Sequence, residues 1–162
     1  MDQQLKQSML EEIDAASEQY PYEAVDVLWV ALVKIANSFP GSNEHRRMLA
    51  LVESMSSEAV WQVLELPAVD ELLHLDPPLE TVLANAHERL EPQATQKAIE
   101  AIRLTLHNGP KAALIALGEL LKRIRNKRAH GFKTRKGPRD TEILSAAKLI
   151  LLAFCRGAIA RL

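Results

Sequence analysis

Short proline-containing breaks divide this sequence into stretches whose apolar residues recur every third or fourth position. The clearest breaks are Phe39-Pro40-Gly41, Asp76-Pro77-Pro78 and Asn108-Gly109-Pro110. Between the breaks, Ala, Leu, Glu, Gln and Lys are abundant, and no run alternates Val, Thr and aromatic residues as a β-strand does. The spacing therefore predicts an all-α protein, a helical bundle of about six to eight helices.

The breaks and the capping residues also predict where individual helices begin and end. We expect helices over residues 3–19, 22–37, 79–90, 111–129 and 141–160, with one more ending at 107. Ser42 or Asn43 is expected to cap a helix that ends near Met55, and Ser57 is expected to cap a short segment broken at Pro67. Residues 1–78 then form an interrupted helical N-terminal part, either an extension or part of the bundle, and residues 79–162 form the core. Asp140 or Thr141 would cap the last helix, and Gly131 would end the helix before it.

The length and composition limit the class of protein. A chain of 162 residues suits one compact domain, with or without an extension. The single cysteine, Cys155, excludes a disulfide and a cysteine-based metal site, and it is expected to be a small buried apolar residue. The N-terminus is polar and acidic, unlike a signal peptide, and the apolar run 149–155 is far shorter than the roughly 20 residues that cross a bilayer. We expect a soluble, cytoplasmic protein that needs no metal or cofactor.

The apolar run from Leu149 to Cys155 leaves the last helix with almost no polar face. Helices of this kind are buried on every side or form a subunit interface. We therefore expect one face of the helix in the core and another in a homodimer.

Charge is distributed unevenly along the chain although the net charge is only −1. Residues 1–119 hold 8 Lys or Arg and 19 Asp or Glu, whereas residues 120–162 hold 12 and 2. This asymmetry indicates an anionic partner for the basic third of the chain. The alternative is that the basic and acidic parts of the chain dock on each other.

One motif in the basic segment combines groups that act on phosphates. Arg125 and Asn126 are followed by His130, the one histidine in this third of the chain. On a helix, Asn126 and His130 share a face, and Arg125 is long enough to reach the same phosphate. Arginine supplies fixed positive charge, histidine exchanges protons near neutral pH, and asparagine can orient the imidazole or hold a ribose. The other histidines lack the spacing of a zinc site, and the chain has no glycine-rich phosphate loop. The alternative explanation is a basic helix end that favours the negative pole of the helix dipole.

Arg125-Asn126-x-x-x-His130 resembles the Arg-polar-x-x-x-His signature of the HEPN superfamily of helical bundles, over six residues and the last helices only. The resemblance implies a metal-independent endoribonuclease with a toxin–antitoxin or antiviral defence role, in which Arg125 and His130 are catalytic and Asn126 supports them. It also implies a homodimer, because family members often build one site from two motifs. Some toxin members carry Tyr two residues after the histidine, where this chain has Phe132, so adenylylation there is not expected.

The basic residues around the motif are the expected RNA-binding groups, since cations neutralise the phosphate backbone. They are Lys127, Arg128, Lys133, Arg135, Lys136 and Arg139. Two alternatives remain: a non-catalytic RNA-binding module, and a protein-interaction module whose basic end docks an acidic partner such as a cognate antitoxin. Aromatic residues are only 4% of the chain, a poor supply for stacking single-stranded bases.

Overall fold

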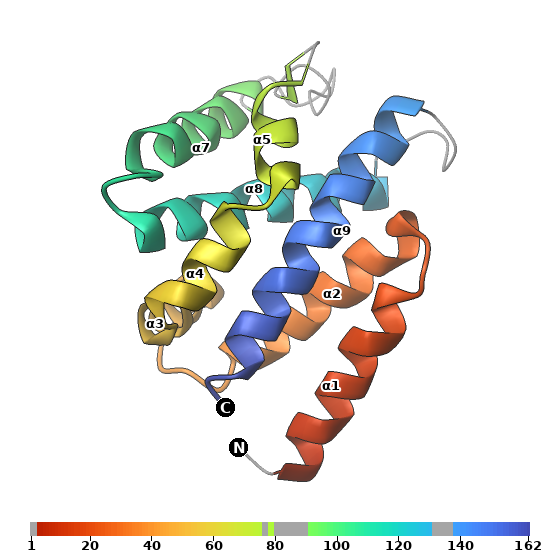
Figure 1. Ribbon diagram of the computed structural model, residues 1–162, viewed down its shortest axis with the longest axis vertical. Helices are drawn as coiled ribbons and strands as arrows, with labels where there is room; N and C mark the ends of the chain where they lie inside the picture. Colours follow the sequence, from red (N-terminus) through yellow and green to blue (C-terminus); the bar gives the residue numbers. More distant parts are fainter. Residues whose placement is uncertain (1–2, 76–77, 80–90, 131–137) are drawn as a thin grey trace.

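The computed structural model describes residues 3–75, 78–79, 91–130 and 138–162, without the side chains of residues 91–92, 127–130 and 138–139. Within these ranges the protein is a helical bundle with no strand, which confirms the all-α prediction. The helices, labelled as in Figure 1, are α1 (Gln3–Ser17), α2 (Pro21–Ala36), α3 (Glu44–Ser54), α4 (Ser57–Leu64), α5 (Pro67–Leu73), α7 (Glu91–Thr105), α8 (Pro110–His130) and α9 (Pro138–Ile159). The helix expected over 79–90 lies almost wholly outside the described residues, as does Gly131.

Proline begins four of the described helices, namely α2, α5, α8 and α9. The ring fixes φ near its helical value, and the N–H that proline lacks would have no partner in a first turn. For this reason α9 begins at Pro138, three residues before the expected start. The expectation that Asp140 or Thr141 caps this helix is wrong. Asp140 lies inside the first turn instead, where its carboxylate faces the positive end of the helix dipole.

Two side-chain caps set the starts of α3 and α4. The Oδ1 of Asn43 accepts from the backbone N–H of Arg46 at 2.8 Å, which selects Asn43 over Ser42 as the cap of α3. The cap of α4 is Ser56, not the expected Ser57. Ser56 has an extended backbone, so its Oγ reaches the N–H of Ala59 at 3.1 Å, whereas Ser57 is already helical.

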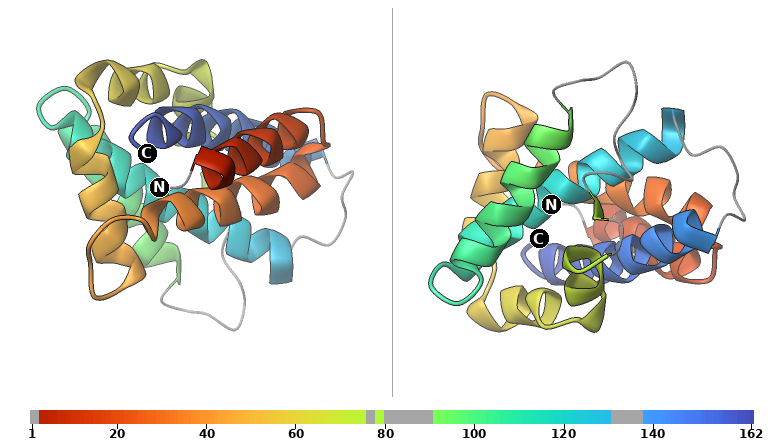
Figure 2. Two further views of the ribbon diagram at one scale, coloured as in Figure 1. Left: turned by 90° about the horizontal axis from the view of Figure 1, so that it is seen from below. Right: turned by 90° about the horizontal axis from the view of Figure 1, so that it is seen from above.

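The helices pack around one apolar core to which helices from both 1–78 and 79–162 contribute. Helix α9 packs against α1, α2, α4, α5 and α8, and α8 packs also against α2, α3, α4 and α7. Figure 1 shows α9 lying across α2 with α1 beside them. The two views of Figure 2 place α9 and α2 between α4 and α5 on one side and the C-terminal end of α8 on the other. The arrangement therefore separates the outer face of α9 from the end of α8.

Burial along α9 divides its apolar run into two faces. Ile150, Leu151, Phe154 and Cys155 are fully buried, whereas the side chain of Leu149 is 53% exposed. One face of α9 therefore lies in the core, as expected. Among the described residues, no helix combines the length and the apolarity that crossing a membrane requires.

Candidate functional site

Helix α8 carries the motif in its last two turns. Its inner stripe is fully buried in the core, and this stripe holds the helix against its neighbours. The stripe comprises Leu114, Leu117, Leu120, Leu121 and Ile124. Arg125 and Asn126 come directly after Ile124, the last residue of this stripe, and Arg125 is partly buried whereas Asn126 is exposed.

Arg125 is held by an acidic residue of α2. Its Nε donates to the Oδ1 of Asp26 at 2.9 Å, and the two side chains are 32% and 35% exposed. The Nη1 of Arg125 also lies 3.4 Å from the Oδ1 of Asn126, at the long end of a hydrogen bond. The guanidinium is thus oriented by α2 and by the next residue of α8, and it remains partly open to solvent.

Asn126 is exposed, and His130 is the last residue of α8. Because both belong to one continuous helix, they lie one turn apart on the same face. The side chain of His130 lies outside the described residues, as do the side chains of Lys127 and Arg128.

The remaining expected RNA-binding residues belong to the connection between α8 and α9. Lys133, Arg135 and Lys136 lie outside the described residues, and Arg139 is placed only by its backbone, in the first turn of α9. The C-terminal end of α8 and the start of α9 lie at the same edge of the molecule in Figure 1. The basic connection therefore joins two helix ends at the edge that carries the motif.

Some of the basic residues after residue 119 form ion pairs with acidic residues of the N-terminal part. Beside the Arg125–Asp26 pair, Lys122 on α8 pairs with Glu44 on α3 at 3.3 Å, and Arg156 on α9 lies 3.6 Å from Asp14 on α1. These contacts agree with the alternative in which acidic and basic parts dock on each other. They involve three of the basic residues after residue 119, so the docking accounts for part of the asymmetry.

The exposed face of α9 borders an apolar groove of about 560 Å³. Its walls come from α4, α5 and α9, and they include Ala59, Leu66, Ala68, Leu149, Leu152 and Ala153. Its floor is tight at Gly157, where an added Cβ would lie 3.0 Å from the Cε of Met55. Glu71 and Arg156 also line the groove, so both signs of charge border it. The groove lies on the opposite side of α9 from the end of α8 (Figure 2).

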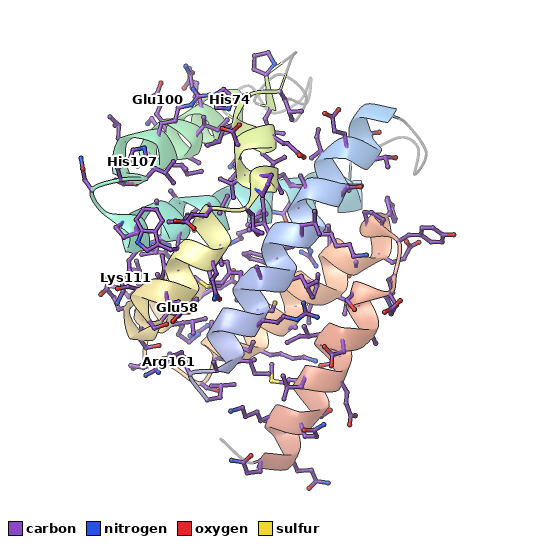
Figure 3. The ribbon with its side chains drawn as sticks, viewed as in Figure 1. Glu58, His74, Glu100, His107, Lys111 and Arg161 are labelled. Carbon is purple, nitrogen blue, oxygen red and sulfur yellow. The ribbon has the colours of Figure 1, made fainter. Side chains whose placement is uncertain are left out.

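Among the described residues, other polar groups form only small exposed clusters, such as His45 with Glu119 at 3.3 Å beside the Lys122–Glu44 pair. In Figure 3, His74 and His107 lie on the α5 and α7 side of the molecule, well apart from each other. No group of three His, Cys, Asp or Glu suited to a metal ion occurs among the described residues. Cys155 is buried and its Sγ donates to the carbonyl oxygen of Leu28 at 3.3 Å, as a small core residue would. Burial raises the pKa of this thiol to about 12, which excludes it as a nucleophile at neutral pH.

Asp26 is the residue of this site that sequence reasoning missed. It lies in the N-terminal part, to which no site residue was assigned, and it is 99 residues from Arg125. The sequence shows Asp26 only as one of two acidic residues on a helix rich in apolar residues, and this does not reveal its partner. Comparisons with family models, with curated proteins and with solved structures found no match to this chain.

Proposed function

We propose that this protein is a metal-independent endoribonuclease of the HEPN type, with Arg125 and His130 as catalytic residues and Asn126 in support. The observation that carries the proposal is the Arg125 guanidinium, oriented by Asp26 at 2.9 Å yet one-third exposed, five residues before the histidine that ends α8. An arginine held in this way at a surface suits a phosphate that arrives from solvent.

The proposed reaction is attack of a ribose 2′-hydroxyl on the neighbouring phosphorus. The 2′-hydroxyl gives up its proton as its oxygen forms a bond to phosphorus. The bond from phosphorus to the 5′-oxygen of the next nucleotide breaks, that oxygen leaves with a proton, and a 2′,3′-cyclic phosphate remains. Histidine suits the proton transfer because its pKa lies near neutral pH. Arginine stabilises the negative charge that develops on the phosphoryl oxygens. His130 would take part in this proton transfer, and Arg125 would stabilise the negative charge on the phosphoryl oxygens.

The basic residues near the motif would hold the RNA backbone on either side of the reacting phosphate. We assign this role to Lys127, Arg128, Lys133, Arg135, Lys136 and Arg139. Each phosphate contact releases condensed counterions, so binding by these residues would weaken steeply as salt rises. The physiological setting implied by the resemblance is a toxin or defence ribonuclease in the cytoplasm, restrained by a cognate antitoxin.

A homodimer through α9 is part of the proposal, and the groove beside Leu149 is the surface that supports it. Leu149 is an exposed apolar side chain next to an apolar hollow, so a two-fold partner could place its own Leu149 there. Because the groove faces away from the end of α8 (Figure 2), this dimer would keep the two motifs apart. A site built from two motifs would instead need contact between the α8 ends.

The test is cleavage of transfer RNA and single-stranded RNA by purified protein in EDTA, beside Arg125→Ala and His130→Ala. We expect cleavage by the wild type, 2′,3′-cyclic phosphate ends, and loss of both in each variant. A 2′-deoxy substitution at the cleaved position should block the reaction. Cleavage that strictly requires Mg²⁺ would overturn the proposal. Tight RNA binding with no cleavage would instead support the non-catalytic RNA-binding module.

A further inference from the structure

Asp26 of α2 holds the motif arginine by a single, well-formed contact. Its Oδ1 accepts from the Nε of Arg125 at 2.9 Å, and both side chains are about one-third exposed. We propose that Asp26 is a positioning residue of the ribonuclease site, which sets the direction in which Arg125 presents its guanidinium to the phosphate. This role rests on the ribonuclease function proposed above.

The contact uses the Nε donor of the guanidinium, on the side of the group away from its outer edge. A guanidinium has five N–H donors, one on Nε and four on Nη1 and Nη2. Asp26 takes the Nε donor, and Asn126 lies near one donor of Nη1. The outer edge formed by the two Nη atoms keeps donors for phosphoryl oxygens, which bind such an edge in pairs. An acceptor fixed on α2 therefore orients the plane of the group without occupying that edge.

The competing explanation is that the Arg125–Asp26 pair only stabilises the fold. Both side chains are partly exposed, which argues against a large contribution to stability. Water screens both charges at a surface, so exposed pairs contribute little to the free energy of unfolding. Misplacing a catalytic group, in contrast, lowers the rate strongly, because the reacting atoms must be aligned. Removal of Asp26 should therefore affect the cleavage rate much more than the thermal stability.

The negative charge of Asp26 should weaken RNA binding, although the contact of Asp26 with Arg125 should support catalysis. A carboxylate beside the motif repels phosphate, so removing it should strengthen RNA binding while it weakens catalysis. A residue that only stabilised the fold would not separate these two quantities. The signature of a positioning role is thus a lower maximal rate together with an unchanged or lower half-saturating concentration.

Glu44 offers a matched control for Asp26. It pairs with Lys122 on the same helix at 3.3 Å, and its side chain is 39% exposed. Glu44→Ala and Asp26→Ala each remove one negative charge and one contact to α8, but only Asp26 contacts a motif residue. Any general effect of charge on RNA affinity or of a lost α8 contact should appear equally in both variants.

The experiment is single-turnover RNA cleavage in EDTA with increasing protein, together with thermal unfolding, for the wild type, Arg125→Ala, Asp26→Ala, Asp26→Asn and Glu44→Ala. We expect Asp26→Ala to lower the maximal rate by about 10-fold or more, with no rise in the half-saturating concentration. Asp26→Asn should lower the maximal rate less than Asp26→Ala does, because the amide oxygen of asparagine can still accept from the Nε of Arg125. Glu44→Ala should keep the wild-type rate.

Each contrary result identifies what has failed. Wild-type cleavage by Asp26→Ala, with none by Arg125→Ala, would overturn the role of Asp26 and leave the ribonuclease standing. Absence of wild-type cleavage would overturn the ribonuclease itself and this role with it. Full cleavage by Arg125→Ala would overturn Arg125 as a catalytic residue, and the role of Asp26 with it. Equal losses in Glu44→Ala and Asp26→Ala would also overturn the role. If Asp26→Ala fails to fold, Asp26→Leu takes its place, because leucine has nearly the size of aspartate but accepts no hydrogen bond, and a wild-type rate in that variant decides against the role.

Discussion

The Nε of Arg123 donates to the Oγ1 of Thr95 at 2.8 Å, and Thr95 is fully buried. This bond ties α8 to α7, whereas Arg125, two residues further along, is tied to α2 through Asp26. Residues two apart on a helix point about 200° away from each other. Helix α8 is therefore held on nearly opposite flanks, which fixes its rotation and the direction in which Asn126 projects.

Thr95→Val should destabilise the protein without a large change in the core volume. The substitution keeps the shape of the side chain but removes the oxygen that accepts from Arg123. A lost hydrogen bond to a charged group, with the donor left in a partly buried place, costs about 1–3 kcal/mol in the free energy of unfolding. Urea unfolding followed by circular dichroism measures this difference.

Thr105→Val is the control for that measurement. The Thr105 hydroxyl bonds to the carbonyl oxygen of Ala101 within the same helix, and the side chain is only partly buried. That carbonyl also belongs to the ordinary hydrogen bonding of α7, so we expect a much smaller loss. Equal stabilities of Thr95→Val and the wild type would mean that the Arg123 contact does not hold α8.

Leu149→Glu should convert a homodimer into a monomer. The side chain is 53% exposed beside the apolar groove of α4, α5 and α9, and a carboxylate there would have to lose its hydration at an apolar interface. Light scattering coupled to gel filtration gives the mass directly. Leu104→Glu, at a leucine of α7 that is 77% exposed, should leave the mass unchanged.

The cleavage rates of these variants bear on the arrangement of the site. Since the groove faces away from the end of α8, a monomeric Leu149→Glu should cleave RNA as fast as the wild type. A monomeric wild type, or a dimer that survives Leu149→Glu, would show that the groove is not the interface between copies.

Cys155 should make the stability fall at high pH. Burial raises the pKa of the thiol from 9.0 to about 12, against a smaller opposing effect of the Arg156 charge. Above about pH 9 the unfolded chain releases this proton while the folded chain keeps it, so unfolding becomes easier as pH rises. Relative to Cys155→Ala, the free energy of unfolding should fall by about 1.4 kcal/mol per pH unit in this range. If the free energy of unfolding falls equally with pH in the wild type and in Cys155→Ala, the raised pKa of the Cys155 thiol is contradicted.

Much of the fold was predictable because its determinants are local. Apolar spacing and breaks identify the helices, and Asn43 begins α3 as its side chain suggests. The errors also have local causes. The capping side chains of Asp140 and Thr141 predict a start of α9 at residue 141, whereas Pro138 begins the helix three residues earlier, because proline suits the first helical position. Adjacent serines at 56 and 57 are equivalent in sequence, and only the backbone conformation selects the first as the cap.

The site was predictable only as far as its residues are neighbours in sequence. Arg125, Asn126 and His130 share one helix, so their spacing is visible in the chain. Asp26 contacts Arg125 because α2 and α8 pack together, and this packing depends on the whole core rather than on any segment. The groove beside Leu149 was foreseen only as an apolar face of the last helix, since its other walls come from α4 and α5.

The 99-residue separation of Asp26 and Arg125 has a consequence for how the protein is made. During translation the carboxylate leaves the ribosome long before its arginine, and domains form in the order in which their parts appear. The basic residues near the end of α8 emerge after the acidic helices against which some of them pack. The nascent chain therefore has no arginine oriented by Asp26 until α8 has docked, and a ribonuclease that works as proposed above would stay inactive beside the ribosomal RNA until then.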